Sequence, residues 1–482
     1  MGLLDDLNPE LVFYYFEELT KLPHGSGNTR AVAKYLMTFA QERNMKYRVD
    51  EAGNVVIFAD GSKGYEDAEP VILQGHIDMV AVKSAESTHD FSNDPLTLAI
   101  DGDEIYAEGT SLGGDDGIGI AYMLAAIDDP AVAHPPLDCI FTTDEEVGML
   151  GAGAFDASDI RGHFMINLDS EEEGVFTCGC AGGARVDTIL PIRRSRIKGL
   201  PVVVFIDGLK GGHSGSMIES GRASANKLMG RFLYGLDQKV AFSLEKVAGG
   251  EKDNAIAVSA KAHLVIDEED YSAVEAFAAA FEKDIRSEMA GTDEGVSVHV
   301  SKGDVHRISV IEPEEQEKIV FLLMHAPYGV RQMSGLMKNV VQTSSNPGIV
   351  RTTDTEFVCA NLVRSSVASG KNSLIDEIRS LADKCGAHVK ISGDYAEWVF
   401  RKESPLREKM VAVYKDMFGS EPVINVVHGG VECGIFAKKI NHFDAVSMGP
   451  NMKDIHTYNE RLSISSSRRV WENLVKLLAE LK

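Results

Sequence analysis

The sequence lacks any apolar run that approaches the ~20 residues needed to span a bilayer as a helix. Residues 1–22 also lack the basic start and apolar middle of a signal peptide. Instead, this segment carries the acidic residues Asp5, Asp6, Glu10, Glu17 and Glu18. We therefore expect no membrane association and no export, and we predict a cytoplasmic location.

The sequence contains few cysteines, and its acidic residues outnumber its basic ones. The 6 cysteines are dispersed along the chain, which argues against a disulfide framework or a zinc knuckle. Buried free thiols are expected instead for Cys139, Cys178, Cys180, Cys359, Cys385 and Cys433. The chain has 48 Lys and Arg against 73 Asp and Glu, a net charge of -25. Because such a surface repels a phosphate backbone, we expect no nucleic-acid partner.

The length of 482 residues predicts more than one domain, because single cores rarely grow beyond ~250–300 residues. Residues 1–185 alternate helix-like segments with short apolar runs, which predicts an α/β domain with helices flanking a mixed sheet. Residues 394–482 return to this pattern and are predicted to complete the same domain. Residues 186–393 would then be an inserted α/β domain. The insertion is large enough for two sub-modules, although no internal repeat is evident in the sequence.

Three short apolar runs, at 71–73, 139–142 and 165–168, lead directly into histidine or acidic residues. The side chains in question are His76, Asp78, Glu145, Glu146 and Asp169. Each motif alone is weak, since a solvated loop explains a few acids equally well. In α/β sheets, however, sites form outside the carboxyl ends of the strands, so several such endings together indicate one site.

Two further segments carry candidate ligands. Asp115 lies in a glycine-rich stretch just before an apolar helix, where an acidic residue could also serve only as a helix cap. His456 follows a glycine-proline turn, where a lone histidine is more often structural. Taken with the strand ends, these residues complete a set of two imidazoles and three carboxylates: His76, Asp115, Glu146, Asp169 and His456.

That set can hold two divalent ions ~3.5–4 Å apart, with one carboxylate between them. Nitrogen and oxygen ligands without thiolate favour Zn²⁺, with Co²⁺ or Mn²⁺ as alternatives. The ligand chemistry therefore predicts a two-metal hydrolase, without naming the bond that is cleaved.

The motifs resemble those of the metallopeptidases related to aminoacylase and carboxypeptidase G, and most closely the aminoacyl-histidine dipeptidase (cytosol non-specific dipeptidase) branch. The resemblance runs nearly end to end. Its markers are GHIDMV at 75–80, GGDDGIG at 113–119, TTDEEVGMLGA at 142–152, INLDSEEEG at 166–174, GCAGG at 179–183, GLKGGHSG at 208–215, NAI at 254–256, LVRSS at 362–366 and GGVECGIF at 429–436.

The resemblance implies hydrolysis of dipeptides by a metal-bound water, with Glu145 as the general base and Asp78 orienting His76. Asp115 would bridge the two metals and precede a cis peptide bond to Asp116. His76 and either Glu146 or Asp169 would divide between the two metals, and His456 would complete the second site.

The inserted region would correspond to the lid and dimerisation domain of that family, so a homodimer is expected. There, His213 would stabilise the oxyanion, Asn254 would assist it, and Arg364 would clamp the terminal carboxylate of the peptide. Whether His213 acts in its own subunit or across the dimer stays open. Without the resemblance, a structural histidine in a glycine turn and an ordinary salt bridge explain His213 and Arg364.

Two alternatives remain. The same fold could hydrolyse N-acyl amino acids or tripeptides, since the chain departs from the family pattern after His456 and after the NAI motif. A non-catalytic relative is the other alternative, but an intact Glu145 and a complete ligand set argue against it.

Overall fold

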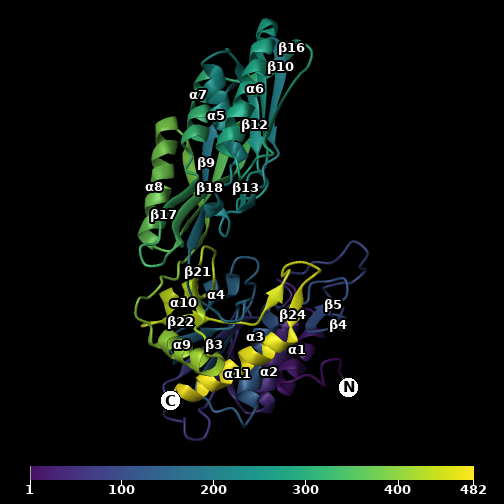
Figure 1. Ribbon diagram of the computed structural model, residues 1–482, viewed down its shortest axis with the longest axis vertical. Helices are drawn as coiled ribbons and strands as arrows, with labels where there is room; N and C mark the ends of the chain where they lie inside the picture. Colours follow the sequence, from purple (N-terminus) through teal and green to yellow (C-terminus); the bar gives the residue numbers. More distant parts are fainter. Residues whose placement is uncertain (1) are drawn as a thin grey trace. The chain divides into compact units, whose positions relative to one another are not determined.

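The computed structural model describes residues 2–482 and divides into two compact units (Figure 1). Unit 1 comprises residues 1–179, 400–426 and 431–482, and unit 2 comprises residues 180–399 and 427–430. The chain therefore leaves unit 1, builds unit 2 and returns, a few residues from the predicted boundaries. A short excursion at 427–430 joins unit 2 again, which the sequence pattern did not predict.

Unit 1 is built on an eight-stranded mixed sheet in the order β1-β2-β6-β3-β7-β22-β8-β21. Strands β6, β3, β7 and β22 run parallel to one another, whereas β1 with β2, β2 with β6, and β22 with β8 pair antiparallel. The strands are β1 (Lys46–Val49), β2 (Val55–Ala59), β3 (Val71–His76), β6 (Leu137–Thr142), β7 (Phe164–Asn167), β8 (Val175–Cys180), β21 (Val423–Val427) and β22 (Asp444–Ser447). Every residue of β3 and β6 is buried, which explains their apolar sequences.

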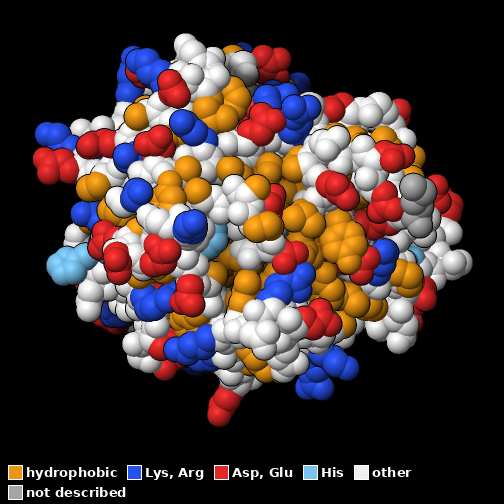
Figure 2. All heavy atoms as spheres, turned by 90° about the horizontal axis from the view of Figure 1, so that it is seen from below, with side chains coloured by type: hydrophobic (Ala, Val, Ile, Leu, Met, Phe, Trp, Pro, Cys, Tyr) orange, Lys and Arg blue, Asp and Glu red, His pale blue; other side chains and the backbone are white. Residues whose placement is uncertain are grey.

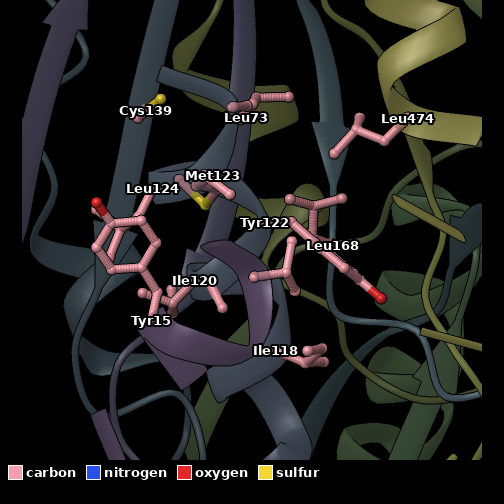
Figure 3. Close-up of a cluster of buried hydrophobic side chains, with 14 of the residues drawn as sticks. Tyr15, Leu73, Ile118, Ile120, Tyr122, Met123, Leu124, Cys139, Leu168 and Leu474 are labelled. Carbon is pink, nitrogen blue, oxygen red and sulfur yellow. The ribbon is translucent and has the colours of Figure 1, made fainter. Parts of the chain in front are cut away.

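Helices cover this sheet and share one hydrophobic core. Helix α3 packs on β3, and both α1 and α11 pack on α3. Figure 3 shows Ile118, Tyr122 and Leu124 of α3 among side chains from the sheet and from α11. The helices of unit 1 are α1 (Glu10–Thr20), α2 (Arg30–Glu42), α3 (Gly114–Asp128), α4 (Leu150–Ala154), α9 (Pro405–Phe418), α10 (Cys433–Lys439) and α11 (Ile464–Glu480).

A second, four-stranded sheet of unit 1 joins two segments that are far apart in the chain. Its order is β23-β24-β5-β4, with Leu462 opposite Ile105. Its strands are β4 (Leu98–Asp101), β5 (Glu104–Ala107), β23 (Met452–Lys453) and β24 (Arg461–Ser463). The loop that carries His456 is therefore fixed at both of its ends.

Unit 2 contains two modules with the ferredoxin-like βαββαβ arrangement. The first module has the strand order β15-β10-β14-β12, and the second has the order β18-β19-β9-β20. They join edge to edge through antiparallel pairing of β12 with β18, so that their strands form one sheet. The second module is interrupted, because the whole first module lies in the chain between β9 and α7.

The first module consists of β10 (Arg194–Asp207), α5 (Ala225–Asp237), β12 (Ser243–Gly249), β14 (Ala260–Ile266), α6 (Tyr271–Glu288) and β15 (Ser297–Lys302). The second consists of β9 (Gly182–Pro191), α7 (Pro313–His325), β18 (Val341–Thr352), β19 (Glu356–Ser365), α8 (Ala368–Cys385) and β20 (His388–Tyr395). Additional strands β16 (His306–Ile311) and β17 (Gly329–Met333) pair with β10 and β18, and β11 (Gly212–His213) pairs with β13 (Ala255–Ile256).

All six cysteines of the described chain are buried, and none of them forms a disulfide. No helix within residues 2–482 is long and apolar enough to cross a membrane. On the face seen in Figure 2, acidic side chains are interspersed with lysine and arginine.

Candidate active site

Three parallel strands of unit 1 deliver polar side chains to one edge of the sheet. Strand β3 ends at His76, which lies opposite Thr142 at the end of β6. The chain continues from β6 into Glu145 and Glu146, and from β7 into Asp169. Because the carboxyl ends of parallel strands meet at the same edge, the register alone brings these segments together.

The aspartate at the start of α3 lies between the two histidines. Nε2 of His76 is 3.0 Å from Oδ1 of Asp115, and Nε2 of His456 is 3.1 Å from Oδ2 of Asp115. Asp169 approaches His76, with 3.5 Å between Oδ1 and Nε2, and Glu146 approaches His456, with 2.8 Å between Oε1 and Nε2. The five predicted ligands thus form two groups that share Asp115.

The donor atoms fit a cation. One ligand atom from each of His76, Asp115 and Glu146 lies within 4.8 Å of the other two. One imidazole and two carboxylates in such a space match the donor types that Zn²⁺ and similar ions take in proteins. The described residues therefore fit a metal centre.

Burial and charge strongly perturb the ionisation of this cluster. Burial raises the pKa of Asp169 to about 7, although the neighbouring His76 opposes the shift. Hydrogen bonds to Asp115 and Glu146 raise the pKa of His456 to about 10. Burial alone would lower the pKa of His76, but the charge of Asp169 and the hydrogen bond to Asp115 outweigh it and hold that pKa well above its usual value. Like charges are therefore crowded here in a way that a cation would relieve.

Asp78 holds the loop that carries the predicted base. Its carboxylate accepts hydrogen bonds from the backbone N–H of Glu145 at 2.9 Å and from the hydroxyl of Ser26 at 2.8 Å. Nδ1 of His76 lies 2.9 Å from the main-chain oxygen of Asp78 and 3.6 Å from its carboxylate. Asp78 thus contacts both the His76 ring and the Glu145 backbone.

Among residues 2–482, Glu145 forms no ion pair with His76 or His456, whose acidic partners are Asp78, Asp115, Asp169 and Glu146. Burial raises its pKa well above the usual value for glutamate, and the nearby charges of Asp169 and Glu432 add to the effect, while His76 opposes it. Glu145 follows Asp144, whose φ of 53° is rare for a residue with a side chain. The turn therefore holds Glu145 and Glu146 in different environments, although they are neighbours in the sequence.

Two glycines of the motifs make room for Asp116. A Cβ on Gly75 would lie 2.2 Å from Oδ2 of Asp116, and a Cβ on Gly119 would lie 2.2 Å from its Oδ1. The Asp116 side chain is fully buried, and its Oδ2 accepts a hydrogen bond from the backbone N–H of His76 at 3.2 Å. The peptide bond between Asp115 and Asp116 is cis, as the resemblance implied.

A buried network behind the strand ends was not recognised from the sequence. Oε2 of Glu432 accepts hydrogen bonds of 2.6 Å from both Gln74 and Thr142. Gln74 in turn accepts one of 2.7 Å from Asn167. Burial raises the pKa of Glu432 to about 7. The only available signal was the position of Glu432 inside the GGVECGIF motif, which says nothing about its partners.

The predicted residues of unit 2 also lie in defined surroundings. His213 pairs with Ala255 across β11 and β13, which brings it beside Asn254, whose carbonyl accepts a hydrogen bond from Ser214 at 2.8 Å. Burial lowers the pKa of His213, and the nearby Arg364 lowers it further. At neutral pH this imidazole is therefore uncharged.

Arg364 is buried on β19 and is only 5% exposed. Its Nη1 donates a hydrogen bond of 2.7 Å to the hydroxyl of Tyr395, while its Nε has no hydrogen-bond partner among residues 2–482. A Cβ on Gly183 would lie 2.4 Å from the Tyr395 hydroxyl oxygen. The glycine in the GCAGG motif thus leaves space for the tyrosine that holds Arg364.

His428 was not predicted from the sequence. It belongs to residues 427–430, the short segment that joins unit 2. Its Nε2 lies 2.7 Å from the hydroxyl of Ser344, the residue paired with Arg364 across β18 and β19. Burial, together with the charges of Arg364 and His213, lowers the pKa of His428 to about 3. The cluster of Arg364, His213 and His428 therefore combines one buried cation with two neutral imidazoles.

An α/β fold with a cluster of acids and histidines at its strand ends is typical of metal-dependent hydrolases. The family model described as "Peptidase family M20/M25/M40" matches residues 72–480, and the chain belongs to this family. The prediction of a peptidase on an α/β fold with an additional α/β unit is thereby confirmed.

Named relatives agree with this membership. The chain is 33% identical to "Cytosol non-specific dipeptidase" of Escherichia coli (strain K12), over 100% of this chain and 99% of the relative. The solved structure of "Aminoacylhistidine Dipeptidase from Vibrio alginolyticus" matches with a TM-score of 0.92 and 33% identity, over 99% of this chain and 98% of the other. Aminopeptidase PepT from Bacillus cereus ATCC 10987 shares the fold at a TM-score of 0.57 and 15% identity, over 98% and 99% of the two chains. The resemblance to the dipeptidase branch is confirmed.

Proposed function

We propose that this peptidase hydrolyses dipeptides and that it does so with two divalent cations held by the shared carboxylate of Asp115. The observation that carries the proposal is the position of Asp115, whose two oxygens lie 3.0 and 3.1 Å from the imidazoles of His76 and His456. The names of the two relatives at 33% identity support dipeptides as the substrate class.

The ligand groups divide between two cation sites in this proposal. His76, Asp115 and Asp169 would hold one ion, and His456, Asp115 and Glu146 would hold the other. When bound, the ions would polarise the scissile carbonyl and lower the pKa of a water molecule. We expect Zn²⁺, and the same donors also accept Co²⁺ or Mn²⁺.

Glu145 is the proposed general base and acid. Its backbone N–H is held by Asp78, so the side chain stays beside the ligands without being required as one of them. A carboxylate in this position can take a proton from the attacking water and later deliver it to the leaving amine. Burial, with the nearby acidic charges, raises the pKa of Glu145 well above its usual value, which suits a group that carries a proton.

The residues of unit 2 are proposed to recognise the peptide. A buried guanidinium with a free N–H, such as that of Arg364, suits a terminal carboxylate, with which it pairs more strongly than with a neutral acceptor. His213 would donate a hydrogen bond to the developing oxyanion, and Asn254 would assist it. A free carboxylate on the substrate would then be required, which fits a dipeptidase.

We also propose that the protein is cytoplasmic and forms a homodimer through unit 2. The word "cytosol" in the name of the Escherichia coli relative supports the first. The expectation that no nucleic acid binds rests on the net charge of -25.

A substrate panel tests the proposed function. The purified protein would be assayed on β-Ala-His, Gly-His, Leu-Gly, a tripeptide and an N-acetyl amino acid, each with and without a chelator. We expect hydrolysis of dipeptides that the chelator abolishes and added Zn²⁺ restores. Hydrolysis of only the tripeptide or the N-acetyl amino acid would replace the substrate class, and activity that survives complete removal of metal would refute the mechanism.

A further inference from the structure

One buried carboxylate outside the predicted set is bonded to the loop that presents Asp115. Glu460 is 3% exposed, and its two oxygens accept hydrogen bonds from four consecutive backbone N–H groups. The donors are Leu112 at 2.7 Å, Gly113 at 3.1 Å, Gly114 at 2.8 Å and Asp115 at 3.3 Å.

The receiving backbone is shaped for an anion. Gly113 is left-handed with φ of 68°, and Asp115 departs from helical geometry although it lies in the first turn of α3. Successive N–H groups in such a turn point into one concavity, and the start of a helix adds positive potential. A Cβ on Gly114 would lie 3.2 Å from Oε1 of Glu460, so the glycine allows the close approach.

Glu460 belongs to the chain segment that carries His456, whereas its four donors belong to the segment that carries Asp115. Glu460 follows His456 by four residues and immediately precedes β24, which pairs with β5. Asp115 is itself one of the four donors. The carboxylate therefore ties together the two chain segments that carry Asp115 and His456, which are otherwise 341 residues apart.

His456 is held in an unfavourable backbone conformation close to this tie. Its φ is 60°, and that of Asp454 is 49°, values that cost energy for residues with a side chain. Surrounding contacts must therefore hold the loop. Thr457 contributes a hydrogen bond to the carbonyl of Asp454, and Glu460 fixes the far end of the same loop.

We propose that Glu460 is a positioning residue that sets the separation of Asp115 and His456 and thereby the affinity of the cation site formed by Asp115, Glu146 and His456. The inference rests on the two-metal part of the proposed function but not on its substrate class. Glu460 contacts neither a cation nor a reacting atom in this account.

The test measures metal affinity directly. Metal-free Glu460→Gln would be titrated with Zn²⁺ in competition with a chromophoric chelator, beside the wild type. Glutamine keeps the size of the side chain but leaves one acceptor oxygen instead of two. We expect one of the two zinc equivalents to bind about 10- to 100-fold more weakly, as is typical when a residue that orients a ligand is changed. At saturating Zn²⁺, kcat should return toward the wild-type value.

Asp444→Asn is the matched control. Asp444 is also buried and also accepts a backbone N–H, from Leu406 at the start of α9, together with the hydroxyl of Ser404. Its carboxylate bonds only to this segment at the start of α9, which carries no predicted ligand. Its variant should lose stability while binding both zinc equivalents with wild-type affinity. Thermal unfolding of both variants would show whether the folds are comparable, and Glu460→Asp, which keeps the charge, should restore part of the affinity.

The outcomes separate the two proposals. Wild-type affinity for both equivalents in Glu460→Gln, or an equal loss in Glu460→Gln and Asp444→Asn, would overturn the positioning role while leaving the proposed function intact. A wild-type protein that binds fewer than two Zn²⁺ ions would overturn the two-metal proposal and this inference with it. A wild type that binds two ions but cuts no dipeptide would refute the substrate class alone.

Discussion

Oδ2 of Asp115 lies 3.1 Å from Nε2 of His456, while its other oxygen faces a second imidazole. One carboxylate therefore belongs to both groups of candidate ligands. Removing the Asp115 carboxylate should disturb both groups together, whereas a change at Asp169 or Glu146 should affect mainly one.

Replacing Gly119 with alanine should destabilise the protein and lower its activity. Gly119→Ala would place a Cβ 2.2 Å from Oδ1 of Asp116, which is fully buried and cannot move freely. We expect a loss of about 1–3 kcal/mol in the free energy of unfolding, as for other overpacked cores. Activity should also fall, because the displaced Asp116 is bonded directly to Asp115. Chemical denaturation and a dipeptide assay would measure the two effects.

Gly153→Ala is the control for this substitution. Gly153 also lies in a helix, α4, but a Cβ there would meet no atom within 4 Å. It should be neutral or stabilise the protein by up to ~1 kcal/mol, because alanine restricts the unfolded chain. Equal effects of the two alanines would contradict the packing argument.

Arg364 provides the second prediction. Arg364→Met should lower kcat/KM for dipeptides by about 10- to 150-fold, which corresponds to a charged hydrogen bond worth about 1.5–3 kcal/mol. The wild type should show a similar loss on dipeptides whose carboxylate is replaced by an amide, and Arg364→Met should show little further loss on them. Steady-state kinetics on both substrates and both proteins completes the cycle.

A matched arginine of the same unit separates recognition from stability. Arg231 pairs with Glu288 on the helices of unit 2. Arg231→Met should leave both substrates unaffected. An amide penalty that is the same in Arg364→Met as in the wild type would show that another group binds the carboxylate.

The lowered pKa of His428 should make the free energy of unfolding depend on pH. Burial and the charges of Arg364 and His213 lower its pKa from about 6.5 to about 3. Between these values the unfolded chain takes up a proton that the folded chain refuses, so acid favours unfolding. The contribution of His428 is fully present above pH 6.5 and declines as the pH falls toward 3.

Denaturant unfolding at several pH values would measure this contribution. His428→Gln should be less stable than the wild type at pH 7, because it disturbs the contact with Ser344. The difference between the two proteins should shrink as the pH falls from 6.5. A difference that stays constant over this range would show that His428 does not titrate as described.

Sequence patterns predicted much of unit 1 because its strands are buried on both faces and its ligands follow directly on them. The run at 71–73 led to β3, and parallel pairing then placed His76, Glu146 and Asp169 at one edge. The start of α3 was less predictable. The apolar helix was expected after the glycine-rich stretch that contains Asp115, whereas the structure begins it inside that stretch, at Gly114, and leaves Asp115 non-helical.

Other features left no pattern in the sequence. The two βαββαβ modules of unit 2 share an arrangement without a recognisable repeat, since a fold constrains burial and not residue identity. Glu460 and His428 stand alone in polar loops, and their partners are backbone N–H groups and a hydroxyl from distant segments. Such contacts depend on tertiary packing, so spacing along the chain could not reveal them.

Dipeptide hydrolysis by Glu145→Gln, with zinc content determined on the same samples, tests the central claim most directly. If Glu145 moves the proton while the other carboxylates and the two histidines hold the ions, the variant should keep about two Zn²⁺ per chain, as we also expect of the wild type, and lose about 10²- to 10⁴-fold in kcat. A variant that keeps both ions and wild-type kcat would contradict the assignment of the base. A variant that loses its zinc would contradict the separation of base and ligands.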